Sequence, residues 1–109
     1  NAKAGAIIER DRNRALSVVS AMELMQGVRD KKEMAQLRQF LLNFETIPLS
    51  AEIGHRACVY MEQHALKVDP APVDALIAAT AVERQQPLCT ANLKHYRQIA
   101  ELELEPFRP

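Results

Sequence analysis

Segments that favour strands and segments that favour helices alternate along the whole 109-residue chain. Apolar or β-branched runs predict strands at 15–20, 46–50, 87–91 and 102–107. Helical spacing of apolar residues predicts helices at 2–11, 21–29, 31–44, 51–67, 74–85 and 92–100. Such alternation is typical of an α/β domain with a mostly parallel sheet, and the length fits a single domain over residues 1–109.

Single residues mark several of the predicted boundaries. Gly27 is expected to end helix 21–29, and Ser50 can cap the N-terminus of the helix that begins at 51. Pro48 has no N–H to donate, which places strand 46–50 at an edge of the sheet. The predicted strands number four and include no long apolar one for the centre of the sheet, although a typical sheet has about five strands or more.

The composition excludes some classes of protein. The 14 basic and 14 acidic residues balance, so bulk positive charge cannot hold a nucleic acid, although local basic patches remain possible. Neither a membrane span nor a signal peptide is predicted. Cys58 and Cys89 lack the spacing of metal ligands and have apolar neighbours. We expect them to be reduced, buried thiols of a cytoplasmic protein.

Three polar side chains are expected at one edge of the sheet. Glu23 follows strand 15–20 by three residues, Asp74 opens the helix leading to strand 87–91, and Asn92 directly follows that strand. The carboxyl ends of parallel strands and the N-termini of crossover helices share an edge, where open α/β sheets bind ligands. Oxygen ligands of this kind suit Mg²⁺ or Mn²⁺ better than zinc.

Helix capping explains each of these residues separately. Ser20 and Glu23 have the spacing of a capping box, and Asp74 or Asn92 could be a plain N-cap. A metal site explains the three together, and both interpretations remain open. Their meeting on one edge favours the site.

The residues around Asn92 allow a functional and a structural interpretation. Thr90 could hydrogen bond a metal-bound water or simply favour a strand. Lys94 and Arg97 could contact phosphates or form a solvated helix face. His95 is expected to pack or to hydrogen bond rather than to act as a general acid.

The motifs "ALSVVSAMELMQGV", "VDALIAATAVERQQPLCTANLKHYRQI" and the closing "LELEPF" resemble a PIN-domain ribonuclease of the VapC toxin type. The resemblance covers essentially the whole chain and implies a PIN-like three-layer α/β sandwich. It implies a metal-dependent endoribonuclease that holds Mg²⁺ or Mn²⁺ through Glu23, Asp74 and Asn92, where many relatives carry Asp in place of Asn92. RNA is then the substrate, a cognate antitoxin inhibits the protein, and a homodimer is expected.

One departure from the family affects both fold and activity. The family opens with an apolar central strand that ends in a catalytic Asp, and the sequence from Asn1 resembles a later part of the pattern. We expect a slot between strands 15–20 and 87–91, filled by residues upstream of Asn1 or by another chain, because buried unpaired backbone groups cost about 1–3 kcal/mol each.

Two other functions remain open at this point. The main alternative is a non-catalytic PIN-like module that binds RNA or an antitoxin, or mediates dimerisation. A fold that binds a small phosphorylated ligand ranks last, because the sequence has no Gly-rich phosphate loop.

Overall fold

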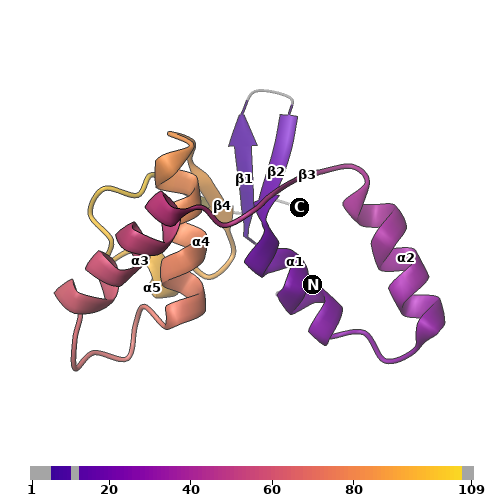
Figure 1. Ribbon diagram of the computed structural model, residues 1–109, viewed down its shortest axis with the longest axis horizontal. Coiled ribbons are helices and arrows are strands. Elements are labelled where there is room, and N and C mark those ends of the chain that lie inside the picture. The colour runs from indigo at the N-terminus through magenta and orange to yellow at the C-terminus, as the bar shows by residue number, and fades with distance from the viewer. Residues whose placement is uncertain (1–5, 11–12, 107–109) are drawn as a thin grey trace.

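The computed structural model describes residues 6–10 and 13–106, which form one five-stranded sheet with helices packed around it (Figure 1). The strands are β1 (Ile7–Arg10), β2 (Asn13–Ser17), β3 (Glu45–Ile47), β4 (Leu88–Thr90) and β5 (Leu104–Pro106). The helices are α1 (Val18–Gln26), α2 (Lys31–Leu41), α3 (Ala51–Gln63), α4 (Pro72–Glu83) and α5 (Leu93–Tyr96). The strand order across the sheet is β3-β2-β1-β4-β5.

Four of the five strands run in the same direction. β2 pairs with β3 in parallel, and β4 pairs with β5 in parallel. β1 lies between β2 and β4 and is antiparallel to both, so β2 and β4 point the same way. The α/β class and the common direction of the four predicted strands are therefore confirmed.

The predicted helix over 2–11 is wrong where the structure describes it, because Ile7–Arg10 is the central strand β1. Ile8 pairs with Ala15 on one side and with Leu88 on the other, and it is 2% exposed. The strands on either side, β2 and β4, each need a hydrogen-bonding partner. Pairing with both of them outweighs the local preference of this segment for a helix. Residues 2–5 and 11 of that predicted helix lie outside the described residues.

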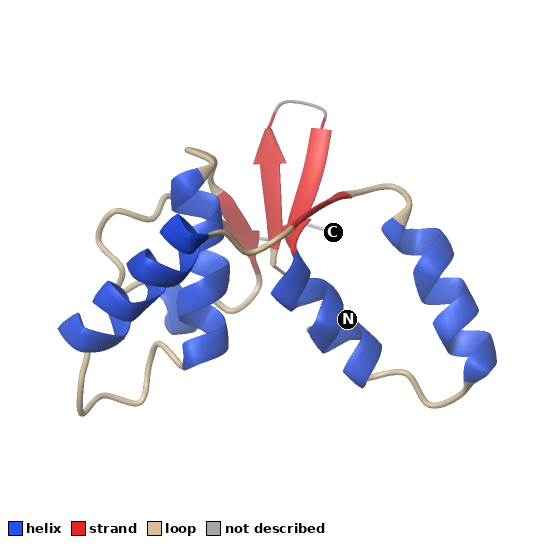
Figure 2. Cartoon of the chain, viewed as in Figure 1, coloured by secondary structure: helices blue, strands red, loops and turns tan. Residues whose placement is uncertain are grey.

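The slot between β2 and β4 is filled, as the hydrogen-bonding argument required. It is filled by β1 of this chain, so the expectation that upstream residues or a second chain would occupy it is wrong. β1 and β2 form a hairpin in which Arg10 pairs with Asn13 (Figure 2). A strand that is adjacent in sequence closes the gap with a short connection, which costs less loop entropy than a distant segment.

The first strand-to-helix boundary lies earlier than predicted. β2 ends at Ser17, whose hydroxyl accepts a hydrogen bond from the Val19 N–H at 3.1 Å and caps α1. Ser20 is therefore inside the helix, and the predicted capping box of Ser20 and Glu23 is wrong. Ser17 pairs with Ile47 as the last residue of β2, and the helix begins directly after it. Gly27 ends α1 as predicted.

The core forms where the sheet meets α3 and α4. α4 contributes a row of fully buried small side chains, and these let α3 approach closely (residues Ala75, Ala78, Ala79 and Ala81). Ser50 caps α3 as predicted, its hydroxyl accepting from the Ile53 N–H at 3.1 Å. β3 lies at the predicted edge of the sheet. These elements place the N-terminus of α4 and the start of α5 next to each other.

In the view of Figure 1, α1 lies between α4 and α2, and α2 lies farthest from α3 and α4. None of the described residues of α2 is fully buried. Met22 and Met25 of α1 and Phe40 and Leu42 at the end of α2 are exposed. We call these four residues the apolar arm surface.

Two smaller expectations are corrected by the structure. Cys58 is exposed and Cys89 is half-buried, so the prediction of buried thiols is wrong. The last predicted helix is the short α5, followed by turns rather than by a continuous helix to residue 100. Among the residues described, no helix is long and apolar enough to cross a bilayer.

Candidate metal and nucleic-acid site

Asp74 lies in the first turn of α4, three positions after the N-cap Ala71. Its Oδ2 accepts a hydrogen bond from the Ala71 N–H at 3.4 Å, which is a long contact for this kind of bond. Asp74 thus has part of the capping role that the sequence allowed, but it is not the N-cap itself. Its side chain is 15% exposed and faces α5 rather than open solvent.

The surroundings of Asp74 disfavour the ionised form of its carboxyl. Burial raises the pKa of the Asp74 carboxyl, and the nearby charge of Asp69 raises it further. His95, the Ala71 N–H and the Tyr96 hydroxyl oppose this and lower the pKa, but burial is the larger effect. The His95 Nδ1 lies 3.7 Å from the Asp74 Oδ2. A bound cation would relieve the burial penalty.

Tyr96 of α5 is a buried residue near Asp74. It is 3% exposed. Burial raises the pKa of the Tyr96 hydroxyl well above its usual range, and the charges of Asp74 and Glu23 raise it further. The approach of Glu23 to Asp74 stays a prediction.

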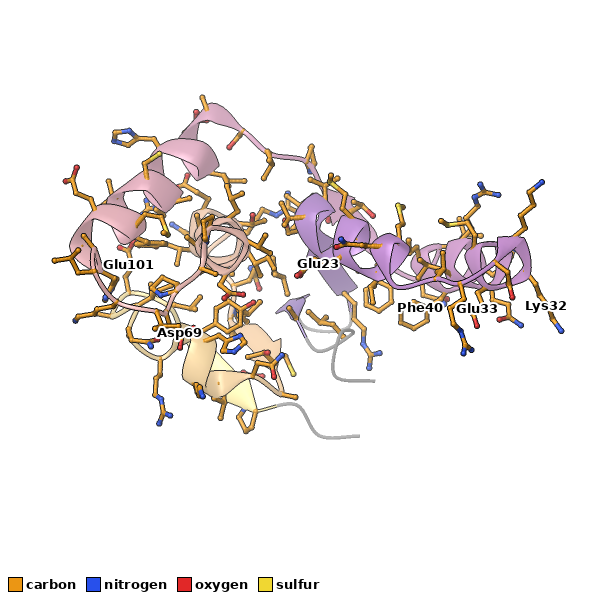
Figure 3. The ribbon with its side chains drawn as sticks, turned by 90° about the horizontal axis from the view of Figure 1, so that it is seen from below. Glu23, Lys32, Glu33, Phe40, Asp69 and Glu101 are labelled. Atoms are coloured by element: carbon orange, nitrogen blue, oxygen red, sulfur yellow. The ribbon has the colours of Figure 1, made fainter. Side chains whose placement is uncertain are left out.

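Glu23 reaches this region from the second turn of α1, which packs against α4. In Figure 3 Glu23 lies where α1 adjoins the rest of the molecule, and its residue is exposed. The helix begins at Val18, so Glu23 is not in the position where a carboxylate caps a helix. The capping interpretation therefore fails for Glu23.

Asn92 stands at the start of α5, directly after β4. Its side chain makes no cap hydrogen bond, and the residue is exposed. The turn is held instead by Thr90, whose buried hydroxyl accepts from the Asn92 N–H at 3.0 Å. The Asn92 amide is therefore not used in the capping role that the sequence also allowed.

The basic residues Lys94 and Arg97 are exposed on or just after α5, on either side of His95 and Tyr96. Their position at the same short helix keeps the predicted phosphate contact possible. His95, which the sequence suggested would pack or hydrogen bond, is the α5 residue that contacts Asp74.

The available ligands are oxygens and fit a hard divalent cation. Two carboxylates, Glu23 and Asp74, and the amide oxygen of Asn92 could hold it. Among the described residues no group of three His, Cys, Asp or Glu side chains is clustered as a ready metal site. Mg²⁺ commonly binds through one or two carboxylates and keeps several waters, so this smaller set fits Mg²⁺ better than a zinc cage.

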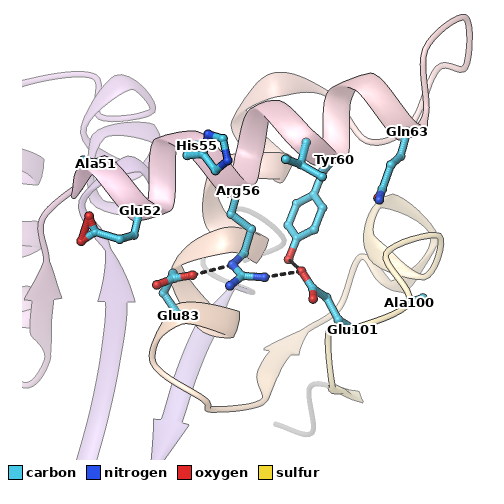
Figure 4. Close-up of a pocket in the computed structure, with 10 residues that line it drawn as sticks. Ala51, Glu52, His55, Arg56, Tyr60, Gln63, Glu83, Ala100 and Glu101 are labelled. Atoms are coloured by element: carbon cyan, nitrogen blue, oxygen red, sulfur yellow. Dashed lines mark hydrogen bonds and ion pairs between the residues drawn. The ribbon is translucent and has the colours of Figure 1, made fainter.

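A separate cavity of about 710 Å³ lies along α3 (Figure 4). Arg56 crosses it and contacts Glu83 at 2.6 Å and Glu101 at 2.7 Å, and the Tyr60 hydroxyl also donates to Glu101. These contacts fasten α3 to the end of α4 and to the segment before β5. None of the predicted site residues lines this cavity.

The sequence and the fold of this chain are similar to those of known proteins. The PIN domain model matches residues 1–102, and the chain belongs to the PIN domain family. The resemblance seen in the sequence is thereby confirmed.

One curated relative and two solved structures are similar to this chain. The chain is 28% identical over 96 residues to "Ribonuclease VapC1" of Methanocaldococcus jannaschii, covering 85% of this chain and 69% of the relative. A toxin–antitoxin complex from Klebsiella pneumoniae matches with a TM-score of 0.67 and 30% identity, covering 81% and 70% of the two chains. VapBC2 from Rickettsia felis, bound to a promoter DNA fragment, matches with a TM-score of 0.71 and 33% identity, covering 86% and 74%.

Proposed function

We propose that this PIN-domain chain is an endoribonuclease, that Mg²⁺ or Mn²⁺ is its cofactor, and that it is the toxin of a toxin–antitoxin pair. The observation that carries the proposal is the placement of the largely buried Asp74 carboxyl, in the first turn of α4, against α5, which begins directly after Asn92. The named activity of the VapC1 relative supports RNA as the substrate. The two similar solved structures, both toxin–antitoxin assemblies, support the biological role.

In this proposal the acids hold the metal and the basic residues hold the substrate. Asp74 and Glu23 would hold the cation through carboxylate oxygens, and Asn92 would hold it through its amide oxygen or through water. A bound divalent cation supplies an acidified water and neutralises charge on the scissile phosphate. Lys94 and Arg97 contact the neighbouring phosphates, which suits a chain without net charge because the affinity comes from a local patch. The Thr90 hydroxyl fixes the turn that presents Asn92.

Exposed apolar residues on the surface, as well as the similar proteins, support the proposal of a protein partner. The apolar arm surface carries Met22 at 60% and Leu42 at 77% exposure, which is costly to leave in water. We propose that a protein partner covers part of it, either the cognate antitoxin or a second copy of this chain. Size-exclusion chromatography with light scattering would distinguish a homodimer from a monomer.

The non-catalytic PIN-like module remains the second candidate. It is favoured by one observation, the lack of a three-residue acidic cluster among the described residues. The two candidates agree on RNA binding and differ on cleavage.

Incubation of the purified chain with single-stranded RNA distinguishes them. The nuclease proposal expects shortened products with Mg²⁺ or Mn²⁺ and none with excess EDTA. RNA that is bound but stays intact under every metal condition would overturn the nuclease and favour the module.

A further inference from the structure

The cavity along α3 has the size of a small-molecule site. Its volume of about 710 Å³ lies within the roughly 300–1,000 Å³ that is usual for such sites, and Ala51, Val59 and Ala100 give it apolar surface. Glu101 lines this cavity and also a second hollow of about 250 Å³, which Glu103 lines too. The two hollows therefore adjoin at Glu101, and together they fit an elongated ligand better than a compact one.

Arg56 fixes the position of two carboxylates in the α3 cavity (Figure 4). Its Nε lies 2.6 Å from Glu83 Oε2, its Nη1 lies 2.7 Å from Glu101 Oε1, and the Tyr60 hydroxyl also donates to Glu101 Oε1. The second oxygen of each carboxylate, Oε1 of Glu83 and Oε2 of Glu101, takes no part in these contacts. Both oxygens can therefore accept a hydrogen bond from a ligand.

The charges around the two hollows favour a cationic ligand. Glu52 lines the α3 cavity and Glu103 lines the second hollow, and neither side chain forms an ion pair within the described part of the chain. Four glutamates thus line the hollows, against the single arginine Arg56. No three acidic, His or Cys side chains of the described residues cluster as metal ligands. The spacing therefore suits a cation whose charges are spread along a chain, rather than a single metal ion.

We propose that the two hollows bind a linear aliphatic polyamine, a small molecule in which ammonium groups alternate with methylene segments. Ammonium groups are donors without an acceptor, which matches the uncommitted carboxylate oxygens along the hollows. The methylene segments pack on Val59 and Ala100. None of the predicted site residues lines either hollow, so this inference is independent of the proposed nuclease activity.

The experiment measures spermidine binding by calorimetry on the full chain, purified free of RNA. The site variant is the double substitution Glu52→Gln with Glu103→Gln, which removes two carboxylates and leaves the contacts of Arg56 in place. The matched control is Glu62→Gln with Glu105→Gln, which makes the same change of charge on α3 and β5 at exposed residues outside both hollows.

The site variant should raise the spermidine dissociation constant by about tenfold, because an exposed pair of opposite charges contributes up to about fivefold in affinity. The control variant should bind spermidine like the unmodified chain. Butylamine, which has one ammonium group, should bind the unmodified chain more weakly than spermidine does. The spermidine-induced rise in melting temperature, taken relative to each variant's own ligand-free melting, separates weaker binding from a general loss of stability.

Three results would overturn the inference. The first is an unmodified chain that binds no spermidine, and the second is an equal loss of affinity in the site and control variants, which would mean a general attraction to acidic side chains. The third is a change of oligomeric state in the site variant alone, measured by light scattering, which would assign the two hollows to an interface between copies of this chain.

Discussion

The Nδ1 of His95 lies 3.7 Å from the Oδ2 of Asp74, and these two residues come from the helices that flank strand β4. The contact joins the first turn of α4 to α5, close to Asn92 and Tyr96. The contact therefore joins two helices that are consecutive along the chain, through residues about twenty positions apart in sequence.

Asp74→Asn is expected to leave the melting temperature unchanged or to raise it slightly near neutral pH. Burial raises the pKa of Asp74 in the folded chain, so the unfolded chain loses this proton first as the pH rises. The stability contribution of Asp74 is then fully present below the unfolded pKa and is lost as the pH rises to the folded pKa. The substitution removes a charge that folding disfavours, and thermal melting across a pH series measures the effect.

The stability gain of Asp74→Asn should therefore be absent at low pH and appear as the carboxyl ionises. A large loss of stability in this variant at every pH would mean that Asp74 is mainly a structural cap of α4.

Mn²⁺ affinity is expected to increase with pH through the raised pKa of Asp74. The cation binds the ionised carboxylate, so protons compete with it, and burial moves that competition to a higher pH than for an ordinary aspartate. Calorimetric titration at about pH 5 and about pH 7.5 should give the tighter binding at the higher pH. Equal affinity at both values would show that Asp74 does not change protonation on binding.

Two serines near the start of α1 are predicted to behave differently. Ser17→Ala should destabilise the chain by about 1 kcal/mol, because the Ser17 hydroxyl accepts from the Val19 N–H and caps the helix. Within the described part of the chain, the buried Ser20 hydroxyl has no hydrogen-bond partner. Ser20→Ala should therefore be neutral or slightly stabilising. Urea denaturation of both variants checks the pair, and a larger loss in Ser20→Ala would favour the capping box that the sequence suggested.

Strand β1 is tested by shortening its central side chain. Ile8→Ala should lower the free energy of unfolding by about 2–5 kcal/mol, the usual cost of removing a fully buried isoleucine side chain. Val68→Ala is the control, since Val68 is almost fully exposed and its shortening should change stability by less than about 0.5 kcal/mol. Equal, small effects of the two substitutions in urea denaturation would show that Ile7–Arg10 does not occupy the sheet centre in solution.

The sequence predicted much of the fold because its local signals were consistent. The end of α1 at Gly27 and the capping of α3 by Ser50 depend on residues close in sequence, and both were predicted correctly. The strand conformation of Ile7 and Ile8 depends instead on pairing with Leu88 and Cys89, some eighty positions later. Local spacing cannot reveal such pairing, so β1 was predicted as a helix.

The candidate site was predicted from topology, because helix N-termini and the carboxyl ends of parallel strands share one edge of a sheet. Asp74 lies in the first turn of α4 and Asn92 directly follows β4, as expected, but the meeting of Glu23, Asp74 and Asn92 stays a prediction. The contact of His95 with Asp74 could not be predicted from the sequence, because it depends on how α5 packs on α4.

The central claim is that Glu23 and Asp74 together support metal-dependent RNA cleavage. The most direct measurement compares the cleavage rate of single-stranded RNA in Mg²⁺ for the unmodified chain, Glu23→Gln, Asp74→Asn and Glu101→Gln. The cleavage rate of each site variant is expected to fall by about 100-fold or more. Removing a group that only hydrogen bonds to a metal ligand costs up to about 100-fold, and losing the ligand itself should cost at least as much. Glu101→Gln, in the α3 cavity, should cleave at the unmodified rate. Cleavage by Glu23→Gln and Asp74→Asn at the rate of the Glu101→Gln control would contradict the claim.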